Sequence, residues 1–95
     1  GQGPTGMALR SGRPAVVRQI DDDPQYWPWR EQAKNRGFAA AVALPLINDG
    51  TPLGTLNLYA GEPQAFDQEE TSLLMKMADN LAYGLGALKS GHRRR

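Results

Sequence analysis

Two apolar segments joined by a short polar turn constrain the fold of this chain more than any other feature. Residues 38–47 (FAAAVALPLI) form the first segment and residues 53–60 (LGTLNLYA) the second. The four residues Asn48-Asp49-Gly50-Thr51 lie between them and are typical of a β-hairpin turn. The sequence therefore predicts an antiparallel strand pair. Pro45 lacks an N–H donor, so we expect it at a non-bonded position or a bulge.

The two faces of this hairpin differ in side-chain size, because side chains alternate between the faces of a strand. The bulky face holds Val42, Leu44, Leu46, Leu56 and Leu58. The opposite face is small or polar and holds Ala41, Ala43, Pro45, Thr55, Asn57 and Tyr59. Since burial of a leucine contributes about 1.5–3 kcal/mol, the bulky face is expected to anchor the fold.

A long amphipathic helix is predicted over residues 68–89. Asp67 and Glu70 resemble a capping box at its start. Apolar residues then recur at spacings of four and three, as in a short heptad seam: Leu74, Ala78, Leu81, Leu85 and Leu88. Leu73 and Met77 widen this stripe. We expect the helix to cover the bulky face of the hairpin and to offer its remaining face to another helix.

The segments before the hairpin are shorter. Pro4 can open a helix that Gly12 and Pro14 end. Residues 15–20 (AVVRQI) favour a short strand. Residues 29–36 favour a helix, and Pro28 argues against one continuous helix from 24 to 36. In the sequence as given, residues 90–95 form a polar tail that suggests a linker.

Composition excludes several classes of function. The 95 residues suffice for one domain, or part of one. The net charge of +1 depends on the terminal Arg93, Arg94 and Arg95; acidic side chains predominate elsewhere, so nucleic-acid binding is not expected. The chain has no Cys and one His, His92, which argues against thiol catalysis, disulfides and His clusters. No apolar run is long enough to span a membrane, and no signal peptide is visible. These features predict a soluble, cytoplasmic module that makes no membrane contact.

The small, polar face of the hairpin suggests a ligand pocket, because such sites combine apolar walls with a few polar groups. The candidate ligand-binding residues are Trp27, Trp29, Phe38, Ala41, Ala43, Thr55, Asn57 and Tyr59. An alternative carries equal weight: the alanines are small because another element packs closely on them, and the tryptophans fill the core.

Charged residues outside this face favour simpler interpretations. Asp21, Asp22 and Asp23 could bind a divalent cation, but a solvated turn is favoured, and no metal site is predicted. Arg30 could meet an anionic ligand, but a surface position is favoured. No cofactor is predicted.

Five motifs in order resemble the C-terminal part of a GAF domain, a sensor module of bacterial signalling proteins. They are Gly3-Pro4-Thr5-Gly6-Met7-Ala8 with Gly12-Arg13-Pro14; Asp21 to Pro24 with Trp29-Arg30; Ala43-Leu44-Pro45-Leu46; Gly54 to Ala60; and Phe66 to Glu70 with Leu73-Leu74. The resemblance runs from residue 3 to about residue 89. It implies an α+β fold of the GAF-like or profilin-like type. An antiparallel sheet would carry the long C-terminal helix on one face, with short helices and a ligand pocket on the other.

The resemblance also implies what the chain lacks and what it serves. The N-terminal helix and first strands of the family have no counterpart, so residues 1–89 are expected to be a partial sensor domain and 90–95 a linker. Related domains precede diguanylate cyclase, c-di-GMP phosphodiesterase or histidine kinase modules. The cysteines of bilin-binding members and of members that reduce free methionine sulfoxide are absent. The Asn-Lys-Phe-Asp-Glu signature of cyclic-nucleotide-binding members is absent too.

Together these features predict a non-catalytic sensory module. An unknown small molecule or a neighbouring domain would shift the C-terminal helix, which passes the change to an output domain of the same parent chain. A homodimer is expected through Leu74, Ala78, Leu81, Leu85 and Leu88. The alternative is a dimerisation module without a ligand.

Overall fold

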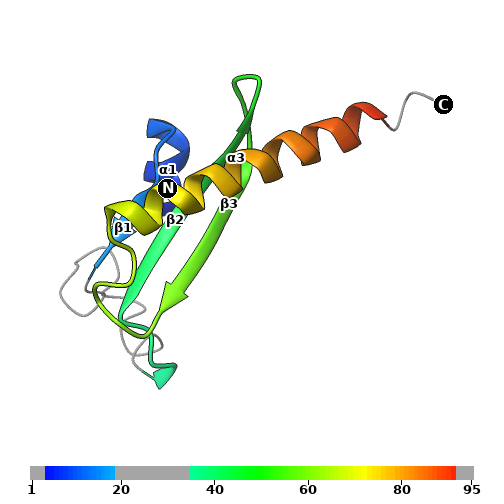
Figure 1. Ribbon diagram of the computed structural model, residues 1–95. Coiled ribbons are helices and arrows are strands. Elements are labelled where there is room, and N and C mark those ends of the chain that lie inside the picture. Colours follow the sequence, from blue (N-terminus) through cyan, green and yellow to red (C-terminus); the bar gives the residue numbers. More distant parts are fainter. Residues whose placement is uncertain (1–3, 19–34, 92–95) are drawn as a thin grey trace.

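The computed structural model describes residues 4–18 and 35–91. Five elements follow one another: helix α1 (Pro4–Ser11) and strands β1 (Ala15–Val17), β2 (Ala40–Asn48) and β3 (Thr51–Ala60), then helix α3 (Gln68–Gly91) (Figure 1). The predicted turn at 21–23, most of the predicted helix at 29–36, and Trp27, Trp29, Arg30 and His92 lie outside the described residues. The α+β fold is confirmed.

The predicted hairpin is the centre of the sheet. Strands β2 and β3 pair antiparallel, and Asn48 pairs with Thr51. Only Asp49 and Gly50 form the loop, with φ angles of 54° and 77°. Positive φ at both loop residues is the signature of a type I′ turn, whose twist matches the twist of the strands. The strands therefore run closer to the turn than the predicted bounds of 47 and 53.

Strand β1 completes a three-stranded antiparallel sheet in the order β1-β2-β3. Its register places Val16 opposite Val42. The strand ends at Val17, short of the predicted residue 20. An irregularity in the pairing of β2 and β3 falls between Leu46 and Ile47, next to Pro45. The expected bulge is therefore present one residue beyond the proline.

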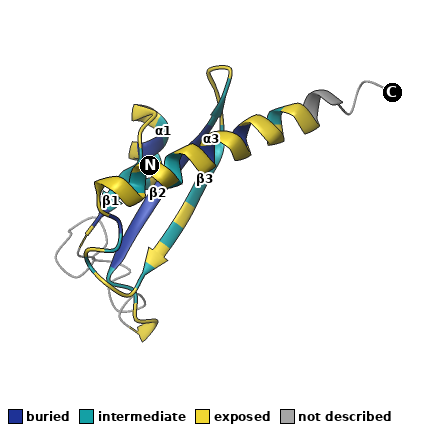
Figure 2. Ribbon diagram, in the orientation of Figure 1, coloured by how far each residue is buried: buried dark blue, intermediate teal, exposed yellow. Residues whose placement is uncertain are grey.

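The bulky face of the sheet packs against α3, as predicted. Val42 pairs with Leu58 and Leu44 with Leu56, so the large side chains of both strands share one face. They form a core with Phe66 and with Ala78 and Ala82 of α3. Figure 2 shows β2 as the most deeply buried element, between its two neighbouring strands. Burial of β2 on both faces explains why its sequence is almost continuously apolar.

Helix α3 begins where the sequence predicts. The Asp67 Oδ1 atom accepts a hydrogen bond from the Glu70 backbone N–H at 2.8 Å, which satisfies one of the free N–H groups of the first turn. The helix crosses the sheet and continues past it to Gly91 (Figure 1). Among the residues of α3 whose burial is described, 68–88, the buried positions lie over the sheet (Figure 2).

Helix α1 packs on the opposite face of the sheet, against β2 and β3. Ala8 is its fully buried residue. Gly12 follows the helix with a φ of 72°, and its N–H donates to the Ala8 carbonyl at 2.9 Å. The predicted helix end is thus confirmed, with glycine in the left-handed conformation that commonly ends helices.

Candidate functional site

The structure brings the small and polar residues of the hairpin together on the α1 side of the sheet. Ala41 pairs with Tyr59, Ala43 with Asn57, and Pro45 with Thr55. Paired residues of neighbouring strands point to the same face. We call this set, with Phe38, the α1-side face: Phe38, Ala41, Ala43, Pro45, Thr55, Asn57 and Tyr59. Its arrangement follows the predicted alternation, while its ligand-binding role stays a prediction.

Helix α1 contacts one part of this face. The Asn57 side-chain Nδ2 donates a hydrogen bond to Thr5 Oγ1 of the helix at 3.3 Å. Ala43, which pairs with Asn57, is 3% exposed, and Ala8 of the helix is fully buried. Small residues let a helix approach a sheet closely, so the close-packing alternative accounts for Ala43 and for the Asn57 amide.

Aromatic rings occupy the other end of the face. Phe38 and Tyr59 stack with their ring centroids 4.9 Å apart and their planes 17° from parallel. Phe38 also packs against a small cluster of Val17 and Ala41. Tyr59 stays 46% exposed, so this pair combines an apolar wall with a polar, accessible hydroxyl group. Phe38 and Tyr59 are the aromatic residues of the predicted ligand set that fall within the described ranges. Trp27 and Trp29 lie outside the described residues.

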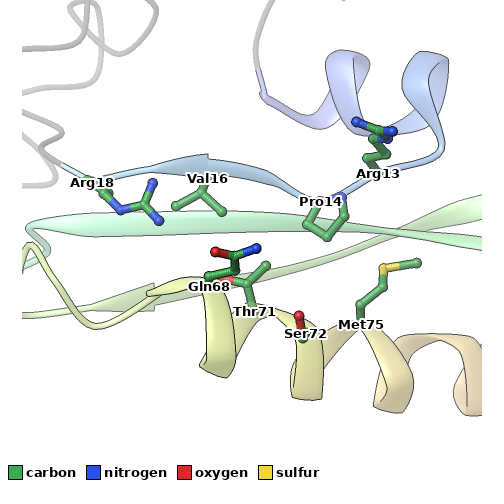
Figure 3. A pocket seen from close by; sticks show the side chains of 8 residues that line it. All are labelled: Arg13, Pro14, Val16, Arg18, Gln68, Thr71, Ser72 and Met75. Atoms are coloured by element: carbon green, nitrogen blue, oxygen red, sulfur yellow. The ribbon is translucent and has the colours of Figure 1, made fainter.

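Two hollows flank strand β1, and no sequence pattern pointed to them. One, of about 560 Å³, lies between β1 and the start of α3 (Figure 3). The other, of about 420 Å³, lies between β1 and α1. Neither is lined by a described member of the predicted ligand set. A hollow between elements distant in sequence depends on tertiary packing, which residue alternation alone does not reveal.

The predicted heptad seam of α3 is divided by the structure. Ala78 is fully buried against the sheet and Leu74 packs on the same core. Leu81, Leu85 and Leu88 are instead exposed, together with two residues that widen the predicted stripe. The exposed apolar stripe of α3 is therefore Leu73, Met77, Leu81, Leu85 and Leu88. Its most exposed member, Leu88, is 70% accessible.

The fold and its sequence match a known family. The family model described as GAF domain matches residues 1–85. The chain belongs to the GAF domain family. GAF domains commonly serve as sensory or regulatory modules of signalling proteins. None of the curated proteins compared matches the chain significantly.

Solved structures with this fold come from both sensors and enzymes. The GAF domain region of a membrane protein described as putative from Geobacter sulfurreducens PCA matches with a TM-score of 0.76 and 23% identity over 90% of this chain and 57% of its own. A domain of a sensor histidine kinase, also described as putative, from Sinorhizobium meliloti 1021 matches with a TM-score of 0.72 and 23% identity. The match covers 87% of this chain and 57% of that one. Free methionine-R-sulfoxide reductase from Neisseria meningitidis matches with a TM-score of 0.69 and 24% identity. The match covers 88% of this chain and 47% of that one. The chain thus spans about half the length of these neighbours.

A membrane-spanning helix and a metal-binding group are both absent from the described residues. No helix in residues 4–18 or 35–91 has the length and hydropathy needed to cross a membrane. Over the same ranges, the acidic and histidine side chains form no group of three that could hold a metal ion. Asp21, Asp22 and Asp23, for which the sequence favours a solvated turn over a cation site, lie outside these ranges.

Proposed function

We propose that this GAF domain is a non-catalytic regulatory module that transmits a signal through α3. The observation that carries the proposal is the double role of α3. One side of the helix forms part of the core through Leu74, Ala78 and Ala82, and another side of the same helix carries the exposed apolar stripe. A change in the packing of the sheet therefore acts on the element that offers the largest exposed apolar surface.

The proposed input site is the accessible end of the α1-side face. The stacked rings of Phe38 and Tyr59 supply an apolar wall, and the Tyr59 hydroxyl supplies a polar group. Thr55 and the Asn57 amide extend the polar groups toward α1, where Asn57 already donates to Thr5. A small, partly aromatic molecule with hydrogen-bonding groups fits this chemistry. A ligand shifts α3 only if it binds two arrangements of the helix with different affinity.

Native mass spectrometry of the purified chain tests this input site. We expect a mass excess under native conditions that disappears on denaturation and whose value identifies the ligand. Tyr59→Ala removes the stacked ring and should abolish the excess, while Thr51→Ala, at an exposed position beside the turn, should retain it. A mass without excess, or an excess that survives Tyr59→Ala, would contradict binding at this face.

The second candidate function is dimerisation without a ligand. The specific observation in its favour is the exposed apolar stripe of α3, because monomeric proteins seldom expose contiguous apolar patches of large area. Native mass spectrometry separates the two candidates, since this one predicts a dimer without mass excess. A homodimer with an intact ligand site combines both functions.

We propose that the output lies in the parent protein and that the domain itself performs no chemistry. A diguanylate cyclase or histidine kinase module on the cytoplasmic side of the membrane fits the proposed transmission through α3. The chain contains no Cys, so it lacks the thiols that methionine sulfoxide reduction requires. Turnover of free methionine sulfoxide by the purified chain would contradict the non-catalytic assignment.

A further inference from the structure

We propose that the outer edge of β1, the edge that faces away from β2, is a docking site for an extended peptide strand with apolar residues at its centre and acidic residues at its ends. Among the strands in residues 4–18 and 35–91, β1 lies at the edge of the three-stranded sheet and pairs with β2 alone. The backbone groups of an edge strand can pair with an added strand, which then receives most of its affinity from the main chain. One side of this edge adjoins the α1-side face, because Val17 packs with Ala41 and Phe38. The inference does not depend on the proposed regulatory function.

The first observation is that a hollow lies on each side of this edge. Pro14, Val16 and Arg18 line the hollow next to α3, together with Thr71 and Met75 of the helix. In Figure 3, Pro14 and Val16 point toward α3, and the Met75 side chain points from the helix toward the strand.

The hollow on the other side of β1 has a similar apolar lining. Ala15 and Val17 line it, together with Pro4 and Met7 of α1. The side chains of an added strand would point alternately to the two faces of the sheet. They would therefore enter the two hollows in turn, which explains how one extended segment could use both.

The second observation is the charge of the lining. Arg13 lines both hollows, and Arg18 lines the one next to α3. In Figure 3 the Arg13 side chain points toward α1 and away from α3, so the two guanidinium groups lie on opposite sides of the strand edge. None of the described lining residues is acidic. Carboxylates at the ends of the peptide would therefore meet cations on both faces.

The position of Arg18 is set by the fold. Its guanidinium Nη2 donates a hydrogen bond to the Phe66 carbonyl at 3.2 Å, which links the end of β1 to the loop two residues before α3. Thr71 Oγ1 donates to the same carbonyl at 3.3 Å. These bonds leave other donors of the five-donor guanidinium group available for a carboxylate. Gln68 and Ser72 add neutral polar groups at the same end of the hollow.

A synthetic peptide tests the proposal. The probe is acetyl-EEVLVEE-amide, in which three apolar residues alternate between the faces and the acidic ends serve either strand direction. Added to the isotopically labelled 95-residue chain, it should bind saturably and shift the amide resonances of Arg13, of residues 15–18 and of the first turns of α3. The matched control peptide has the same sequence with N-methyl groups on Val and Leu, which remove the backbone donors. It should show no saturable binding.

Charge reversals test the role of the arginines. Arg13→Glu and Arg18→Glu should each weaken binding by about three- to tenfold at low salt. Lys76→Glu, an equal charge change at an exposed residue of α3 that lines neither hollow, should leave the affinity unchanged. Because Arg18→Glu also removes the bond to Phe66, Arg13→Glu is the decisive variant if the Arg18 variant fails to fold.

Three outcomes would overturn the proposal. Equal binding of the N-methylated peptide would place the peptide in a hollow without strand pairing. The absence of saturable binding would show that the edge does not accept a strand. Concentration-dependent shifts of residues 15–17 in the chain without peptide would assign the edge to a second copy of this chain.

Discussion

The end of β2 approaches α3 closely where Asn48 lies against Gly86. A Cβ atom placed on Gly86 would collide with the side-chain Nδ2 and Cγ atoms of Asn48. Glycine in a helix interior costs about 0.5–1 kcal/mol relative to alanine. The glycine is therefore best explained by this contact, because a Cβ at this position would require the Asn48 side chain to move.

Two glycine substitutions separate helix propensity from this contact. Gly84→Ala, at a position with open space around it, should raise the free energy of unfolding by about 0.5–1 kcal/mol. Gly86→Ala should raise the free energy of unfolding by a smaller amount or should lower it, because the Asn48 side chain must move. Chemical denaturation measures both. In an Asn48→Ala background, Gly86→Ala should recover the gain of Gly84→Ala; equal gains in the native background would refute the contact.

At the scale of elements, α3 shows most clearly what the sequence could predict. Its start at Asp67, its length and its packing on the bulky face all followed from capping and apolar spacing. The division of its apolar residues between core and surface did not. Its leucines form a stripe wider than the sheet can cover, so several of them stay exposed. The fully buried residues in the described part of the helix are Ala78 and Ala82. Alanine gives a weak hydrophobic signal, so Ala82 was not anticipated.

The α1-side face was predictable in part for a related reason. Alternation along the two strands is enough to place Ala41, Ala43, Thr55, Asn57 and Tyr59 on one face, and the register confirms this. Alternation could not tell which of the small residues lie beneath a helix. The contact of α1 with Asn57, and the hollows on both sides of β1, depend on how distant segments pack.

The exposed apolar stripe of α3 leads to a prediction about oligomeric state. Leu81→Glu and Leu88→Glu should convert a dimer into a monomer, because each places a charge in the surface that two copies would share. Tyr83→Glu is the control: Tyr83 is 72% exposed on α3 and lies outside the stripe. Light scattering after size-exclusion chromatography measures the mass. A Tyr83 variant that dissociates as readily as the leucine variants would refute the assignment of the stripe.

At the scale of the whole molecule, stability depends on a narrow core. Leu44 is fully buried at the centre of β2, opposite Leu56 of β3 and in the core that includes Ala78 and Ala82 of α3. Leu44→Ala should lower the free energy of unfolding by about 2–5 kcal/mol, because it removes buried methyl groups and leaves a cavity. Domains of this size are usually stable by only about 5–15 kcal/mol. The loss should be a large fraction of the total.

Urea denaturation measures this loss directly. The control is Leu88→Ala, which makes the same chemical change at a residue that is 70% exposed. We expect a change of no more than about 0.5 kcal/mol there. Comparable losses for the two variants would mean that Leu88 is covered in solution, and would direct attention to the dimer.

The residues of α3 that follow one another at four-residue intervals along the sheet decrease in size toward the hairpin turn. They are Leu74, Ala78, Ala82 and Gly86. A slide by four residues, about 6 Å along the axis at 1.5 Å per residue, would move each of these residues close to its neighbour's place. Sliding in one direction would drive Leu74 into the space of an alanine, and sliding in the other would leave voids. The packing of these residues therefore opposes displacement of α3 along its axis. Any movement that the helix transmits should then be a tilt about its Gly86 end.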